Sequence, residues 1–297
     1  MILTRPEKLI EWLDALTVMG SGARGQRIPT GVADFDSILG GGLPPGSVVL
    51  LLGDVGSGFT EFAYTSAAKI SMAKDRPESI AFLMGDRAAE GKLPDSIHYA
   101  TFFKPREEIM QEILFSFNDD FYSAFGRHVQ FTDLSQFYFD KSVVPPSWVG
   151  DSKNLLLNRK GDVINSFVNF LEENAQSSLV VVDSLTDLVV SESVELMDIV
   201  SMLRGMQRMA KKWKGVIYLL LTEGILEKRK EQMIIDSVDG VLVFEWSRHT
   251  TSSKRQRYIY IAKFVSLMPH LDEQRIARFA TTLTSQSGLV VIDTERI

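Results

Sequence analysis

The chain has 297 residues, a net charge of −6 and no cysteine. The length suits one large domain, and the lack of cysteine excludes disulfides, thiolate zinc sites and cysteine nucleophiles. The mild negative charge argues against bulk electrostatic binding to nucleic acid. Because we find neither a signal peptide nor an apolar run long enough to span a bilayer, we expect a cytoplasmic protein without a membrane span.

The N-terminal residues 1–25 predict a helix followed by a linker. Apolar side chains recur at a helical period within Pro6–Val18, and three glycines follow it. We expect this helix either to pack on its own domain or to dock on a neighbouring subunit. Residues 26–297 are expected to form a single domain, with the Phe- and Tyr-rich stretch 94–158 as an elaboration within it.

Short apolar runs then alternate with amphipathic stretches, which predicts alternating strands and helices. The expected strands are Ser47–Leu52, Ser79–Leu83, Ile97–Phe102, Val129–Leu134, Leu179–Val182 and Val216–Leu221. The expected helices are Thr60–Ala73, Arg106–Phe117, Asp162–Asn174 and Val194–Trp213. This order predicts a mostly parallel sheet with helices on both faces.

The C-terminal part has strands without helices between them. These strands are Gly240–Trp246, Arg257–Val265, Ile276–Leu283 and Gly288–Ile292. Such strands are expected to join through hairpins and to pair antiparallel. The sequence therefore predicts an α/β fold in which a parallel core is followed by a small antiparallel extension.

A glycine-rich loop follows the first strand and opens the first long helix. It reads Gly53-Asp54-Val55-Gly56-Ser57-Gly58-Phe59-Thr60. Working phosphate loops read G-x-x-x-x-G-K-[ST], so Phe59 occupies the lysine position here. The backbone N–H groups would still form an anion nest, but a charge-assisted hydrogen bond worth about 1.5–3 kcal/mol is lost. Two interpretations stay open: weakened nucleotide binding, or glycines that only turn the chain.

The segment before this loop is more specific than the loop itself. Residues 27–47 read RIPTGVADFDSILGGGLPPGS. This resembles the KaiC/RadA branch of RecA-like ATPases, in which a TG…LD…LGGGLPxGS segment precedes the phosphate loop. The resemblance extends from Gln26 to the end of the chain. It implies a RecA-like core with ATP or ADP and Mg²⁺ as cofactors.

The resemblance also implies roles for single residues. Asp183, which ends an apolar strand, matches the carboxylate that holds Mg²⁺ together with Thr60. Thr222 matches a polar position that faces the γ-phosphate. The family places a catalytic carboxylate at the end of the strand after the loop helix, where we read Gly85 and Asp86, so Asp86 is the candidate.

In this family, a late strand carries a K-x-R pair that completes the site of the next subunit. Lys263 matches the lysine, but Val265 stands where the arginine belongs. An arginine finger contributes about 10³–10⁵ in rate where it has been measured. The changes at Phe59, at Gly85–Asp86 and at Val265 together predict little or no hydrolysis.

We therefore expect a catalytically degenerate RecA-like protein that regulates or scaffolds, for example in signal transduction, through protein partners or self-assembly. One alternative is an ATPase of unusual design, in which Lys69 or Lys263 replaces the loop lysine. Another is a recombinase-like accessory protein that binds DNA, which the net charge disfavours.

Two further features have more than one interpretation. The basic segment Ser247–Arg257 is either a solvated hairpin loop or a contact for nucleic acid or an acidic partner. The four histidines lack metal-ligand spacing, so we expect no metal other than Mg²⁺. They are His98, His128, His249 and His270.

Overall fold

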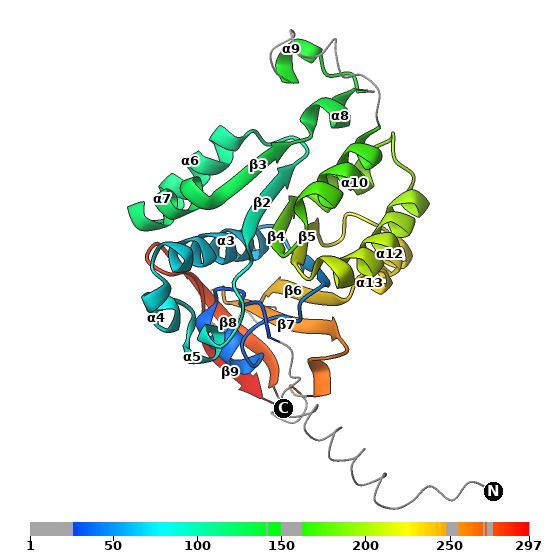
Figure 1. Ribbon diagram of the computed structural model, residues 1–297. Coiled ribbons are helices and arrows are strands. Elements are labelled where there is room, and N and C mark those ends of the chain that lie inside the picture. Colours follow the sequence, from blue (N-terminus) through cyan, green and yellow to red (C-terminus); the bar gives the residue numbers. More distant parts are fainter. Residues whose placement is uncertain are drawn as a thin grey trace, which may run out of the picture.

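The computed structural model (Figure 1) describes residues 26–140, 142–149, 162–247, 255–269, 271 and 276–296. The helix expected at Pro6–Val18 and the side chains of His249 and His270 lie outside these residues. No helix in these ranges is both long and apolar enough to cross a membrane.

A single sheet runs through the described part, with nine strands in the order β3-β2-β4-β5-β1-β6-β7-β8-β9. The strands are β1 (Ser47–Gly53), β2 (Ser96–Thr101), β3 (Val129–Asp133), β4 (Ser178–Asp183), β5 (Val216–Thr222), β6 (Gly240–Trp246), β7 (Arg257–Phe264), β8 (Ile276–Thr284) and β9 (Gly288–Arg296). The strands from β3 to β6 in this order are parallel, and β6 to β9 pair antiparallel. The predicted parallel core and antiparallel extension are thus confirmed.

Helices cover both faces of the parallel part (Figure 1). The longer helices are α3 (Phe59–Asp75), α6 (Arg106–Ser116), α7 (Asp119–His128), α10 (Val163–Asn174), α12 (Leu196–Trp213) and α13 (Lys228–Asp236). Alternate side chains of β1 enter two separate cores: Val49 and Leu51 pack with α3, α6 and α7, whereas Val48 and Leu50 pack with α10 and α12. Burial on both faces explains the continuous apolar sequence of these strands.

The strand predicted at Ser79–Leu83 is wrong. This segment forms a 3₁₀ turn, Pro77–Ser79, and the short helix α4 (Ile80–Met84), in which Phe82 is 90% exposed. A short apolar run does not by itself distinguish a strand from a helix. The first strand after α3 is instead β2, which pairs with β4.

The region expected to be an elaboration, 94–158, contains parts of the core. Both β2 and β3 lie in it and form one edge of the sheet, with α6 and α7 between them. The short helices α8 (Ser135–Phe139) and α9 (Pro146–Val149) follow, and they lie beyond the end of β3 at the top of Figure 1.

The lead-in to β1 is organised by a buried carboxylate. Asp36, in α2 (Ala33–Ile38), accepts hydrogen bonds from the N–H and Oγ1 of Thr30, both at 2.8 Å, and from the N–H of Gly31 at 2.9 Å. Burial raises the pKa of Asp36 to about 7, while these hydrogen bonds act in the opposite direction. The TG…D pattern of the sequence therefore encodes a hydrogen-bonded turn that fixes the chain beneath α3.

Candidate functional site

The glycine-rich loop has the predicted strand–loop–helix setting. β1 ends at Gly53 and α3 begins at Phe59. The tip is exposed, with Val55 at 81%, whereas Ser57 is fully buried. Gly56 and Gly58 have φ values of 74° and 109°. These are left-handed conformations that other residues adopt only with strain, so the loop depends on both glycines.

The Phe59 side chain packs inward against the protein. Its Cδ1 lies 2.6 Å from the place that a Cβ on Gly53 would take, and its ring centroid is 6.5 Å from that of Phe244. Phe59 is therefore half-buried against the core that contains α3. An apolar contact has replaced the charge that a lysine would supply, so the loop itself carries no cation.

The N-terminus of α3 nevertheless has unused hydrogen-bond donors. The first backbone hydrogen bond of the helix is donated by Phe62 to Gly58, and no side chain caps the helix. In the part of the chain that the structure describes, the N–H groups of Phe59 and Thr60 therefore meet no acceptor. The hydroxyl of Ser57 is also buried without a partner. The two N–H groups and the helix dipole suit a phosphate group, so this end of α3 fits an anion.

Two side chains, one from β6 and one from β7, contact the loop, and neither was predicted from the sequence as a site residue. Trp246 Nε1 donates to the carbonyl of Val55 at 3.3 Å, and Arg257 Nε donates to the carbonyl of Gly56 at 3.1 Å. The Arg257 guanidinium also stacks on the Trp246 ring at 4.3 Å. Trp246 and Arg257 face each other because they are register partners in β6 and β7.

Asp183 ends β4 as predicted, and it is engaged with a tyrosine. Tyr99 Oη donates to Asp183 Oδ2 at 2.8 Å, and Asp183 is only 9% exposed. Burial raises the pKa of Asp183, whereas the bond from Tyr99 and the charge of Lys104 act in the opposite direction. One carboxylate oxygen of Asp183 therefore already accepts a side-chain hydrogen bond.

Thr60 lies on the side of α3 that faces this carboxylate. Thr60 and Tyr64 are four residues apart and share a helix face, and the Tyr64 ring lies 6.1 Å from that of Tyr99. Tyr64 Oη donates to Glu112 at 2.7 Å, and Lys104 pairs with Glu112 at 2.8 Å. A tyrosine and ion-pair network thus fills the space next to Asp183.

Thr222 lies beside the loop, at the end of β5. It is the register partner of Gly53, and its N–H donates to Thr186 Oγ1 at 2.9 Å. Asp183 ends β4 and Thr222 ends β5. Because the strands are parallel, both residues lie at the same edge of the sheet as the loop, as the sequence predicted.

Asp86 is not at the end of a strand. It begins the short helix α5 (Asp86–Ala89) and is exposed, because the predicted strand before it is helical. The strand that actually follows α3 is β2, and after its last residue come Phe102 and Phe103. Phe102 is fully buried. The position that the resemblance assigns to a catalytic carboxylate is therefore occupied by phenylalanines.

The two lysines considered as replacements for the loop lysine lie elsewhere. Lys263 Nζ donates to the carbonyls of Ile235 and Asp236 at the end of α13. It is six residues along β7 from Arg257, or about 20 Å. Lys69 is ten residues along α3 from Phe59, or about 15 Å. Neither lysine supplies a cation to the loop of its own chain, and a role of Lys263 in a neighbouring subunit stays a prediction.

No group of three or more potential metal ligands occurs among the described residues. His98 Nε2 hydrogen-bonds Ser96 at 2.9 Å, and His128 Nε2 pairs with Asp75 at 2.7 Å. Both described histidines therefore have local structural partners.

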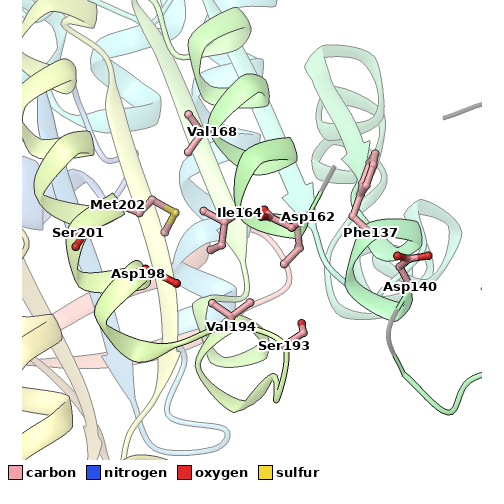
Figure 2. A pocket seen from close by; sticks show the side chains of 11 residues that line it. Phe137, Asp140, Asp162, Ile164, Val168, Ser193, Val194, Asp198, Ser201 and Met202 are labelled. Carbon is pink, nitrogen blue, oxygen red and sulfur yellow. The ribbon is translucent and has the colours of Figure 1, made fainter. Parts of the chain in front are cut away.

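A cavity of about 490 Å³ lies away from the loop, between α8, α10 and α12 (Figure 2). Three of its lining residues are the carboxylates Asp140, Asp162 and Asp198, and the rest are apolar side chains and serines. None of the described residues that line it is a cation.

Comparisons with known proteins identify the fold. No protein-family model matches the chain, and no curated protein matches it in sequence. Among solved structures, it is similar to the KaiC-like protein PH0186 of the hyperthermophilic archaeon Pyrococcus horikoshii OT3, with a TM-score of 0.58 and 16% sequence identity. The match covers 90% of this chain and 99% of that one. The chain therefore has a KaiC-like, RecA-type α/β fold, as its sequence predicted.

Proposed function

We propose that this protein is a RecA-type domain that no longer hydrolyses nucleotide. It acts as a regulatory or scaffolding factor through protein partners or self-assembly, for example in signal transduction, and it binds ATP or ADP weakly or not at all. The observation that carries this proposal is the Phe59 ring, which packs against Gly53 and Phe244 where a lysine would hold the phosphates.

Two further features support the proposal. Asp183 accepts a hydrogen bond from Tyr99, and Phe102 and Phe103 follow β2 where a water-positioning carboxylate is expected. When bound, Mg²⁺ would neutralise phosphate charge, and Asp183 and Thr60 are the residues that would hold it. Loss of charge stabilisation and loss of the group that orients water both slow phosphoryl transfer, so their effects reinforce each other.

Phosphate release from ATP with Mg²⁺ tests the proposal directly. We expect the wild-type protein and an Asp183→Ala variant to release phosphate at the same background rate. Turnover that disappears in both Asp183→Ala and Thr60→Ala would show that the site is an active ATPase and would overturn the proposal.

Calorimetric titration with ATP and ADP measures binding separately from turnover. We expect Phe59→Lys to bind ATP about 10- to 100-fold more tightly than wild type, because it restores a charge-assisted hydrogen bond. Light scattering with and without nucleotide then measures self-assembly. A strictly monomeric protein that captures no protein partner would contradict the scaffolding role.

A further inference from the structure

A guanidinium group lies beside the phosphate loop, although the loop has lost its lysine. Arg257 comes from the start of β7, at the end of the basic segment Ser247–Arg257. Its Cδ is 3.6 Å from the place that a Cβ on Gly58 would take, and Gly58 is the N-cap of α3. The Arg257 side chain therefore lies beside the N-cap of α3, the helix whose first N–H groups meet no acceptor among the described residues.

Two contacts fix this guanidinium in place. Nε donates to the carbonyl of Gly56, and Cζ lies over the ring of Trp246, 4.3 Å from its centroid. Trp246 is itself tied to the loop through its bond to Val55. Because a guanidinium has five N–H donors and Nε–H is one of them, four donors on the terminal nitrogens are left for another acceptor.

The charge of Arg257 has no counter-charge in the described part of the chain. No carboxylate there lies within ion-pairing distance of it, whereas Arg278 and Arg127 each pair with acidic side chains. An unpaired and positioned guanidinium beside free helix N–H groups has the chemistry of a phosphate site, because its planar donors match phosphate oxygens.

We propose that Arg257 is the phosphate-binding cation of this loop and takes the place of the lysine that Phe59 replaces. The ligand class is a diphosphate or triphosphate, whose terminal phosphates meet the guanidinium while the α3 N-terminus binds through Phe59 N–H and Thr60 N–H. This inference rests on the proposed function in one respect, namely that the loop is no longer a hydrolytic site. It adds that phosphate binding survives through a residue outside the loop.

Calorimetric titrations of inorganic pyrophosphate, ADP and AMP at low salt test this inference. We expect wild type to bind pyrophosphate and to bind ADP more tightly than AMP. Arg257→Gln should weaken pyrophosphate and ADP binding by about 10- to 100-fold and reduce the preference for ADP over AMP. Arg255→Gln is the matched control, because Arg255 also approaches Trp246, at 5.9 Å, but has no bond to the loop. The affinity of Arg255→Gln for pyrophosphate and ADP should stay within about threefold of that of wild type.

A second variant separates charge from support of the loop. Arg257→Lys keeps the positive charge but cannot make the Nε bond to Gly56, and we expect it to lose less pyrophosphate affinity than Arg257→Gln does. Thermal unfolding of each variant verifies that it is folded. The inference is overturned if wild type binds neither pyrophosphate nor ADP at millimolar concentration, or if Arg257→Gln weakens AMP and ADP equally. Either result would leave the proposed non-hydrolysing function intact. Mg²⁺-dependent turnover of ATP would instead overturn that function, without affecting the conclusion that Arg257 binds phosphate.

Discussion

Replacing Tyr99 by phenylalanine removes one hydroxyl group next to Asp183 and leaves the ring in place. The ring keeps its contacts with Tyr64, Phe125 and Phe131. The lost hydrogen bond, 2.8 Å long, is made to a nearly fully buried carboxylate. Hydrogen bonds to charged groups contribute about 1.5–3 kcal/mol, so we expect the free energy of unfolding to fall by about that amount at about pH 8.

The loss caused by Tyr99→Phe should depend on pH. Burial raises the pKa of Asp183, so its contribution to stability is lost as the pH rises through the folded-state pKa. The Tyr99 bond opposes this shift because it stabilises the charged carboxylate. Without the bond the pKa rises further, and the variant should lose more stability at about pH 8 than at about pH 5.

Urea unfolding of wild type and Tyr99→Phe at both pH values measures this effect. Tyr64→Phe is the control, because its hydroxyl donates to Glu112, whose side chain is 37% exposed, and we expect a loss of about 1 kcal/mol or less. An equal loss for Tyr99→Phe at the two pH values, or a loss below about 0.5 kcal/mol, would refute the reasoning about Asp183.

Three further predictions concern the scaffold of the site. Burial raises the pKa of Asp36 to about 7, so the stability that protonated Asp36 contributes is lost as the pH rises from about 4 through about 7. Asp36→Asn should therefore flatten this part of a plot of Tm against pH. Gly42→Ala places a Cβ 2.2 Å from the Ile28 carbonyl oxygen at a φ of 120°, and should lower the free energy of unfolding by about 3 kcal/mol or more, measured in urea. Lys263→Met removes two hydrogen bonds at the end of α13, and should cost about 1 kcal/mol and speed hydrogen exchange in Lys228–Asp236 without changing exchange in α3.

The sequence alone was sufficient for the fold class and for most of the loop. Buried parallel strands are continuous apolar runs, and Gly53, Gly58 and Thr60 have a fixed spacing, so both signals are local. The segment around Thr30 and Asp36 identified the RecA-like fold for a similar reason, since its residues bond to one another within a single turn.

The tertiary structure decided which residues surround the loop. The run Ser79–Leu83 was as apolar as a strand, but in the structure it lies outside the sheet and forms α4. The first strand after α3 therefore ends at Thr101, before Phe102, and not at Asp86. Arg257 lies far from Gly56 in the chain, and only the pairing of β6 with β7 brings them together. Spacing along a chain encodes local turns, whereas a site assembled from several strands depends on sheet order and register, which no single segment contains.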